Sequence, residues 1–596
     1  MKWFFTPPAE SDPSPHRDDD QAPGQIALPA ALLQRHGARV LDPGKAVRLS
    51  GDQPPRPTVY RANTLLVPDV VRRDDDVRRT ITTVLANIGI ELITPEPDRR
   101  DEFDVPQLPS TAVLAPLLGH PTPVVVDAWV ALQTLRADGI AQKRADRHTE
   151  AVEQISLEHL MVSSAITGSP ATEGGGGIAG GPGASGAVSG PTATDSYLFS
   201  GADARTPIAV VFDPPTRKQA DQCAADHGRR PVVAVLDTGV RAQPWLDVAP
   251  DGAGGYTMPA DSFVAVDDDI QAAIAAESQQ AREKGDHSRQ VIWDAWDKPM
   301  MASPLIGEFN PALGHSTFIA GIVRQVAPDA RVLAVRVLHS DDVAYEGDIL
   351  CALRHLIKRI ELAEEGDLAG MVDVVSLSFG YFSESAHDKI VTAGLWKAIE
   401  ALLGLGVVVV AAAGNFATSR EFYPAAFARE PVPAGQLPVI SVGALNPNGT
   451  KAMFSNDGPW VTAWARGAAV VSTYPTDVDA SRTPELRIPV DRTPPGTLPP
   501  GREALDPDDF RGGWAIWSGT SFSTPYLAAL IARSLLAGAA QAHGDLRLDR
   551  PGPAGADWAA VIAKRKERAA AALRELRAEE EKLLQEVRRA EAPSGD

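Results

Sequence analysis

The sequence predicts an α/β fold whose main domain is a doubly wound, mostly parallel sheet, with a small α+β domain before it and a helix after it. Residues 231–236 and 406–414 are apolar runs with the composition of strands buried on both faces of a parallel sheet. Residues 315–323 and 526–532 are apolar segments with helical character, so strands and helices alternate along the chain. A chain of 596 residues is longer than one ordinary domain, and two or three folded units are therefore expected.

The N-terminal part of the chain is expected to contain a disordered segment followed by the small α+β domain. Residues 1–56 are rich in Pro, Asp and Gln, a composition typical of disorder. A strand is predicted at residues 60–67, a helix with one apolar face at 74–88, and a second strand at 90–93. We assign this domain to residues 57–167.

A linker is predicted between this domain and the main one. Residues 168–196 are rich in Gly, Ser, Pro and Ala, a composition that builds no core and predicts a flexible tether. The main domain is assigned to residues 197–540. Two insertions, 241–313 and 476–512, interrupt it and are expected to rim the site, and the first contains a charged helix predicted at 268–284.

The last part of the chain, residues 541–596, predicts a long charged helix over residues 558–592. An apolar seam with coiled-coil spacing runs along this helix, but Lys566 and Glu580 interrupt it. We expect the helix to pack on its own domain, and self-association or partner binding through the seam is the alternative. The seam consists of Ala569, Leu573, Leu576, Leu583 and Val587.

Residues capable of catalysis stand at predicted strand ends and helix starts. Asp237 and Asn415 directly follow the two predicted strands. His315 and Ser521 stand where helices are predicted to begin. Open α/β sheets build their sites at the carboxyl ends of strands, so we expect these side chains to meet. At a helix N-terminus, the helix dipole would stabilise a serine alkoxide or a tetrahedral oxyanion at Ser521. Singly, each residue has a structural reading as a cap or a turn.

The segments around these residues resemble the subtilisin-like serine proteases, or subtilases. Their chain order is Asp, His, Ser, which distinguishes them from chymotrypsin-like enzymes and α/β-hydrolases. The resemblance covers residues 205–540 and leaves both ends unexplained. Ser316 stands where the family usually has Gly, and Ser523 where it usually has Ala. The matching segments are Val235-Leu236-Asp237-Thr238-Gly239, Gly314-His315-Ser316-Thr317, Ala413-Gly414-Asn415 and Gly519-Thr520-Ser521-Phe522-Ser523-Thr524-Pro525.

The resemblance implies a catalytic role for each of these residues. Ser521 would attack a peptide carbonyl, and His315, with an ordinary pKa near ~6.5, would take up its proton. Asp237 would orient the imidazole and stabilise its charged form. Asn415 would donate to the developing oxyanion together with the backbone N–H of Ser521.

Substrate-binding residues are also implied by the resemblance. Ser378, Phe379 and Gly380 would pair with an extended substrate as an added strand. Ala412, Ala413 and Gly414 would line the first specificity pocket. Phe379 either narrows a subsite or belongs to the core, and the preferred substrate side chain is not determined by these residues.

Composition restricts partners and location. A net charge of -20 argues against a nucleic-acid partner, which needs a basic surface. Two cysteines, Cys223 and Cys351, do not make a disulfide framework. The apolar run near the N-terminus is shorter than that of a secretory signal, and no run approaches the ~20 apolar residues of a membrane helix, so we expect a cytoplasmic protein without a membrane partner.

We therefore expect a serine endopeptidase that needs no cofactor for its chemistry and acts on polypeptides. Calcium stabilises many subtilases, but no compact ligand cluster in this sequence identifies a site for it. A self-processing protease acting mainly on its own linker is one alternative, and a non-catalytic scaffold that retains the fold is another. The domain at residues 57–167 is either an inhibitory prodomain or a docking and recognition module.

Overall fold

The computed structural model describes residues 3–5, 28–49, 52–95, 108–142, 147–164, 205–210, 212–303, 308–310, 312–363, 370–385, 393–478, 487–488, 502–503, 510–546 and 558–591. Most of the linker predicted at 168–196, and much of the insertion predicted at 476–512, lies outside these residues. In the described part of the chain, no helix is long and apolar enough to cross a membrane.

The central sheet has eight strands in the order β1-β20-β19-β18-β16-β8-β14-β11. All neighbours pair in parallel except β1, which adds to β20 in the antiparallel sense. The non-consecutive strand order gives the doubly wound α/β fold that the sequence predicts. The strands are β1 (Trp3–Phe5), β8 (Val232–Asp237), β11 (Val264–Val266), β14 (Arg331–Arg336), β16 (Val374–Leu377), β18 (Val408–Ala412), β19 (Ile440–Leu445) and β20 (Ala463–Arg466).

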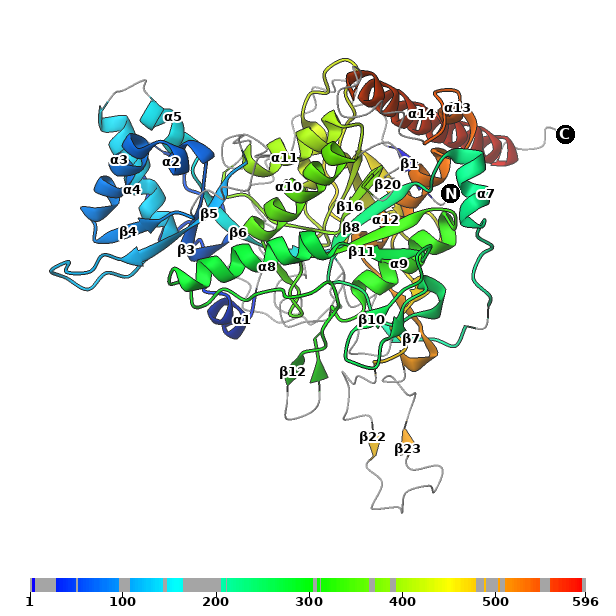
Figure 1. The fold of residues 1–596 in the computed structure, drawn as a ribbon, viewed down its shortest axis with the longest axis horizontal. Helices are drawn as coiled ribbons and strands as arrows, with labels where there is room; N and C mark the ends of the chain where they lie inside the picture. The colour runs from blue at the N-terminus through cyan, green and yellow to red at the C-terminus, as the bar shows by residue number, and fades with distance from the viewer. Residues whose placement is uncertain are drawn as a thin grey trace.

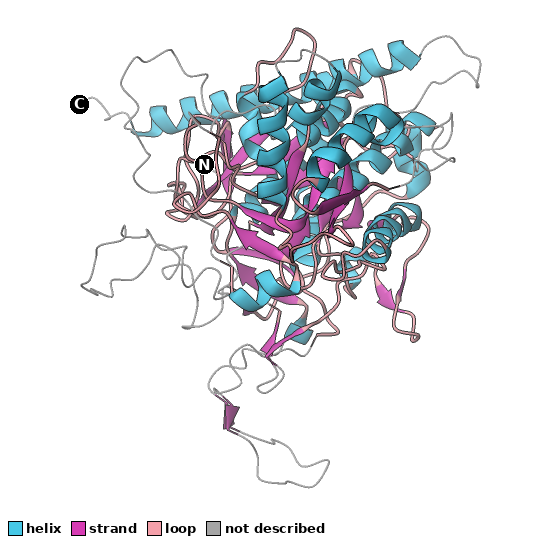
Figure 2. Ribbon diagram, turned by 90° about the vertical axis from the view of Figure 1, so that its left-hand side faces the viewer, coloured by secondary structure: helices cyan, strands magenta, loops and turns pink. Residues whose placement is uncertain are grey.

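Helices surround this sheet, and the strands are gathered inside them (Figures 1 and 2). One group comprises α8, α10 and α11, and a second comprises α9, α12 and α14. The helix predicted at 268–284 is confirmed as α8. The helices of the main domain are α7 (Ala220–His227), α8 (Asp268–Glu283), α9 (His315–Val326), α10 (Glu346–Leu362), α11 (Ala393–Gly404), α12 (Thr520–Ser534), α13 (Gly538–Gln541) and α14 (Trp558–Glu591), with 3-10 turns at Pro244–Leu246, Ala425–Arg429 and Phe510–Gly512.

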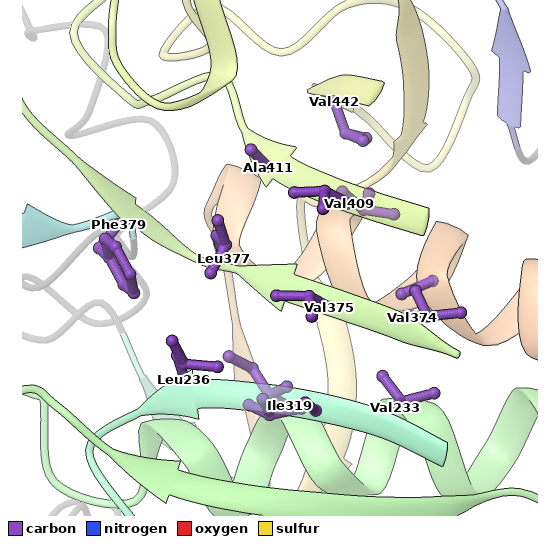
Figure 3. Close-up of a cluster of buried hydrophobic side chains, with 14 of the residues drawn as sticks. Val233, Leu236, Ile319, Val374, Val375, Leu377, Phe379, Val409, Ala411 and Val442 are labelled. Atoms are coloured by element: carbon purple, nitrogen blue, oxygen red, sulfur yellow. The ribbon is translucent and has the colours of Figure 1, made fainter. Parts of the chain in front are cut away.

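The core of the central sheet consists of aliphatic side chains. Val233, Val375 and Val409, from three neighbouring strands, are fully buried. Figure 3 shows Ile319 of α9 against the strand that carries Val233. Strands this apolar on both faces must be covered by helices, and for that reason the continuous apolar runs identified them in the sequence.

A second sheet joins the N-terminal part of the chain to the main domain. Its order is β15-β6-β3-β5-β4, and β17 and β2 pair with β6 and β3. We call residues 28–164, which contribute most of this sheet and four helices that share a separate apolar core with it, the N-terminal unit. Its elements and the main-domain strands of this sheet are α1 (Ala30–Arg35), β2 (Ala38–Val40), β3 (Val59–Val67), α2 (Asp69–Arg73), α3 (Asp75–Ala86), β4 (Ile90–Ile93), β5 (Ser110–Pro116), α4 (Ala128–Gln142), α5 (Arg147–Glu153), β6 (Ser156–Ser163), β15 (Val343–Tyr345) and β17 (Phe379–Gly380).

The prediction of disorder over residues 1–56 is wrong for residues 3–5 and 28–49. Trp3 and Phe5 of β1 are buried beside β20, and β2 pairs with β3. Arg577 of α14 lies over the ring of Phe5. Tertiary contacts with distant parts of the chain order these segments, and composition alone does not contain such contacts.

The C-terminal helix α14 packs on its own domain, against α12, α13 and β1. Of the predicted seam, Ala569, Leu573 and Leu576 are buried in the main core. The side chains of Leu583 and Val587 lie outside the described residues.

Short sheets complete the fold: β7 (Thr206–Pro207) with β24 (Trp514–Trp517) and β21 (Val470–Thr473), β9 (Ala249–Pro250) with β10 (Tyr256–Thr257), β12 (Met301–Ser303) with β13 (Glu308–Phe309), and β22 (Arg487–Ile488) with β23 (Arg502–Glu503).

Candidate active site

Asp237 and His315 form a buried pair at the carboxyl end of the central sheet. Asp237 is the last residue of β8 and His315 the first of α9. The Nδ1 atom of His315 lies 2.8 Å from Oδ1 of Asp237, which also accepts a hydrogen bond from the backbone N–H of Thr238. Neither side chain is exposed. The carboxylate therefore fixes the ring orientation and leaves Nε2 facing away from it.

The environment of His315 stabilises its charged form. Burial opposes the charge, but the carboxylate of Asp237 outweighs burial and raises the pKa of His315 above its ordinary value. The ring packs against Trp517 and Phe522, with centroids 5.5 and 5.4 Å away. Nε2 has no hydrogen-bond partner among the described residues, so it is available to exchange a proton.

Ser521, the second residue of α12, is fully buried and directly precedes Phe522, whose ring packs against His315. Its hydroxyl donates to the carbonyl of Ser378 at 3.2 Å rather than to His315. Its backbone N–H donates to the carbonyl oxygen of Ser164 at 3.0 Å. The start of α12 thus donates a backbone N–H to the carbonyl of Ser164, which directly follows β6.

Asn415 donates to the same carbonyl oxygen. Its Nδ2 atom lies 2.6 Å from the oxygen of Ser164. Its Oδ1 accepts from the backbone N–H of Thr520 at 3.0 Å and from the Thr520 hydroxyl at 2.9 Å. These bonds fix the amide with its NH₂ toward Ser164. Two donors from different elements therefore converge on one peptide carbonyl, which is the arrangement of an oxyanion hole.

The segment that carries this carbonyl lies between two strands of the main domain. β6 pairs antiparallel with β15, where Val343 is opposite Val162, and with β17, where Gly380 is opposite the same residue. The backbone N–H of Ser164 donates to the carbonyl of Ser378 at 2.8 Å. Ser378, Phe379 and Gly380, expected to pair with substrate, thus pair with a strand of this chain, and Phe379 is also a buried core residue.

The residues expected to line the first pocket lie at the end of β18, whose last residue is Ala412. Ala412, Ala413 and Gly414 are buried, and the N–H of Gly414 donates to the hydroxyl of Thr520 at 3.1 Å. Gly414 has φ +97°, and a Cβ there would lie 2.5 Å from Nδ2 of Asn456. Both the positive φ and the lack of space for a Cβ therefore require glycine at the position before Asn415.

Three neighbours of the site were not identified from the sequence. The Oδ2 atom of Asp297 accepts from the N–H of Gly314 at 2.7 Å, and Thr238 Oγ1 accepts from the N–H of Ser316 at 3.2 Å, so both hold the start of α9. Burial raises the pKa of Asp297 to about 6. Asp297 lies in the insertion 241–313, and no spacing signal in the sequence marks it.

Asp342 is the third neighbour. It directly precedes β15, with φ +73°, and its buried carboxylate interacts with the side chain of Ser163 and with the charges of His315 and Asp237. Burial raises its pKa to about 7. Asp342 therefore faces the residue before Ser164 in the bound strand.

Metal and thiol chemistry find no support in the described part of the chain. No group of three or more His, Cys, Asp or Glu side chains there is arranged to hold a metal ion. Cys223 and Cys351 are buried and unpaired, and burial raises the pKa of both thiols, which makes them poor nucleophiles.

Comparisons with known proteins agree with the family resemblance seen in the sequence. The subtilase family model matches residues 228–542, more than half of the chain. Subtilisin DY of Bacillus licheniformis is 32% identical over 177 residues, which is 28% of this chain and 56% of that protein. Thermitase of Thermoactinomyces vulgaris is 31% identical over 178 residues, 28% of this chain and 54% of that protein. The chain thus spans about half the length of these relatives.

Solved structures are matched as well. One is a cold adapted subtilisin-like serine proteinase, with 18% identity and a TM-score of 0.29 over 51% of this chain and 74% of the other. Another is a lanthipeptide protease, with 17% identity and a TM-score of 0.33. The match covers 51% of this chain and 72% of the other. TM-scores this low support no conclusion about the site.

Proposed function

Because the chain belongs to the subtilase family, we propose that it is a serine endopeptidase in which Ser521 attacks a peptide carbonyl. The observation that carries this proposal is the position of the Ser164 carbonyl. It accepts from the N–H of Ser521 and from Asn415 while the strand before it is paired on both sides. A peptide bond held in this way has its carbonyl polarised and its carbon close to the serine.

The proposed reaction uses the groups already described. The Ser521 hydroxyl turns from Ser378 toward Nε2 of His315, which takes its proton as the oxygen attacks the carbonyl carbon. Negative charge on the carbonyl oxygen is stabilised by Asn415 and the Ser521 N–H. His315 then protonates the leaving amine, and water releases the acyl group from Ser521 by the same steps in reverse. Asp237 stabilises the imidazolium throughout.

A hydroxyl deletion with a matched control tests the proposal. The substrate is a peptide that copies residues 156–169. Ser521→Ala should lower its hydrolysis by more than about 10⁴-fold. Ser523→Ala makes the same chemical change two residues further along α12, at a buried hydroxyl without a hydrogen-bond partner in the described structure, and should leave hydrolysis near wild type. Undiminished hydrolysis by Ser521→Ala contradicts the proposal, and a wild-type protein that neither hydrolyses the peptide nor cuts its own chain is a non-catalytic scaffold.

A second candidate function is self-processing after Ser164. It is favoured because the carbonyl held by Ser521 and Asn415 belongs to this chain and precedes the Gly-rich segment. In this proposal the N-terminal unit is an inhibitory domain that fills the cleft until its bond to the main domain is cut. The strand would continue to occupy the cleft as a product.

Mixing two forms of the chain tests self-processing. A tagged Ser521→Ala chain is incubated with wild type at several total concentrations. Intramolecular cleavage leaves the tagged chain intact while wild type is cut at a rate independent of concentration. Cleavage of the tagged chain at a rate proportional to wild type would instead show that one molecule processes another.

A further inference from the structure

A charged side chain of β6 occupies an enclosed site on the main domain at a distance from the scissile position. If Ser164 is counted as the first residue and the strand is followed backward, His159 is the sixth. The last pair between β6 and β15 joins Leu160 to Tyr345, and α10 begins at the next residue, Glu346. His159 therefore lies where the paired strand passes the start of α10.

Three side chains of the main domain enclose His159. Its Nδ1 lies 2.7 Å from Oε2 of Glu346, which also accepts from the backbone N–H of His159 at 3.2 Å. Its Nε2 lies 2.8 Å from Oε2 of Glu384. The ring stacks on Tyr381 with centroids 4.2 Å apart and planes at 23°. All of these side chains are buried.

The geometry requires a charged imidazole. Each ring nitrogen faces a carboxylate oxygen, and only the imidazolium donates from both nitrogens. Burial opposes the charge, but Glu384 and Glu346 outweigh it and raise the pKa of His159 to about 10. The site thus selects positive charge, using two carboxylates and an aromatic face that also attracts cations.

The three side chains that enclose His159 all come from the main domain, and the N-terminal unit adds a backbone hydrogen bond from Arg56 to the carbonyl of Glu384. Glu346, Tyr381 and Glu384 all belong to the main domain, next to strands β15 and β17, which pair with an extended peptide. The Oε1 atom of Glu384 is buried and has no hydrogen-bond partner among the described residues. A guanidinium, with more donors than imidazolium, would supply one.

We propose that Glu346, Tyr381 and Glu384 form a binding site for a positively charged side chain six residues upstream of the cleaved bond in polypeptide substrates. The inference rests on the proposed endopeptidase function. Backbone pairing alone tolerates any sequence, whereas this site selects arginine, lysine or charged histidine at one position.

The first experiment measures binding without catalysis. A recognition sequence for a specific protease is placed within residues 165–204 of the full Ser521→Ala chain, the chain is cut there, and release of the N-terminal fragment is followed by size exclusion after dilution. We expect His159→Leu to speed release at least tenfold and His159→Arg to remain within about threefold of the parent. Equal release for all three would overturn the proposal.

The second experiment measures substrate selection. Peptides that copy residues 156–169 carry Arg or Leu at the position of His159. We expect kcat/KM to be at least tenfold higher for the Arg peptide, and the ratio to fall toward one in the Glu346→Gln, Glu384→Gln double variant. Hydrolysis without this preference overturns the proposed site. If the peptide is not hydrolysed and the wild-type chain is not cut either, the endopeptidase function fails, and fragment release alone decides whether the site exists.

Discussion

The central sheet and the second sheet differ in how many charged side chains they bury. Between its strands and helices the central sheet buries aliphatic residues such as Val233 and Val409. The second sheet also buries apolar residues, but where the N-terminal unit meets the main domain it buries ions as well. Arg289 donates to Glu158 at 2.8 and 3.0 Å and to Asp348 at 2.6 Å, and Arg61 pairs with Asp286. We call Arg61, Glu158, Asp286, Arg289 and Asp348 the buried charge cluster.

This difference distinguishes the core of the central sheet, which is permanent, from the contact between the N-terminal unit and the main domain, which can be broken. Apolar packing tolerates exchange of one apolar residue for another and depends little on pH or salt. A buried ion must keep its partner, because the desolvation of an unpaired charge is not offset. The main domain is therefore stabilised mainly by the first kind of interaction. The N-terminal unit is held on it by both kinds, through buried apolar residues such as Leu160 and Met161 and through the buried charge cluster.

The largest expected effect comes from breaking the buried charge cluster. Arg289→Ala leaves Glu158 and Asp348 without their main partner, and should lower the free energy of unfolding of the N-terminal unit by about 3–5 kcal/mol. Val409→Ala in the central sheet, its apolar counterpart, should cost about 1.5–3 kcal/mol. The two losses of stability are compared by urea denaturation, in which the unfolding of each sheet is followed by hydrogen exchange in β3 and in β18. An equal or smaller effect of Arg289→Ala would remove the distinction between the sheets.

Asn415 connects the two sheets, because it lies after β18 of the central sheet and donates to the carbonyl of Ser164, which directly follows β6 of the second sheet. A substitution of Asn415 therefore tests this connection. Asn415→Leu should lower kcat by roughly 10²–10³-fold with little change in KM, since the donor acts mainly in the transition state. Steady-state kinetics on the peptide that copies residues 156–169 measures both. An effect on KM alone would mean that Asn415 binds ground-state substrate instead.

His159 makes the second sheet sensitive to pH. Its pKa is about 10 in the folded chain and near ~6.5 when exposed, so its contribution is fully present below pH 6.5 and is lost as pH rises toward 10. The groups facing it are Glu346, Glu384 and Tyr381, and burial keeps the pKa of Tyr381 above this window. One pKa unit corresponds to about 1.4 kcal/mol, so the contribution of His159 to the free energy of unfolding falls by at most roughly 4–5 kcal/mol over this pH range.

Fragment release from the cut Ser521→Ala chain, measured between pH 6.5 and 10, tests this dependence. Release should accelerate with pH in the parent and remain nearly constant in His159→Gln. The same pH slope in both proteins would assign the dependence to other groups.

The smallest expected effect is at β1, where the N-terminal segment contacts the central sheet instead. Phe5→Ala removes a buried ring beneath Arg577 and should cost about 1–3 kcal/mol with no dependence on salt, because the lost contact is mainly apolar. Thermal unfolding at low and high salt measures it. A strong salt dependence would show that charged contacts stabilise the position of β1, as the pair of Glu158 with Arg289 does for β6.

Prediction from the sequence succeeded where the signal was local. The apolar runs identified β8 and β18. Asp237, the last residue of β8, is hydrogen-bonded to His315, and Asn415, shortly after β18, is hydrogen-bonded to Thr520. These signals are contained in consecutive residues, because a parallel strand is buried along its whole length.

The rest depended on contacts between distant residues. Asp297 holds the start of α9 from inside an insertion, and Ser164 reaches the site because β6 pairs with strands more than 150 residues further along the chain. β1 joins the central sheet from the other end of the chain. No periodicity or motif records such pairings.

Self-processing at the peptide bond that follows Ser164 requires both Ser521 and the observed position of the Ser164 carbonyl, and the masses of the wild-type chain after purification test it most directly. We expect two fragments, one ending at Ser164 and one beginning at Ala165, and an intact chain for Ser521→Ala. An intact wild-type chain, or the same fragments from Ser521→Ala, would contradict it.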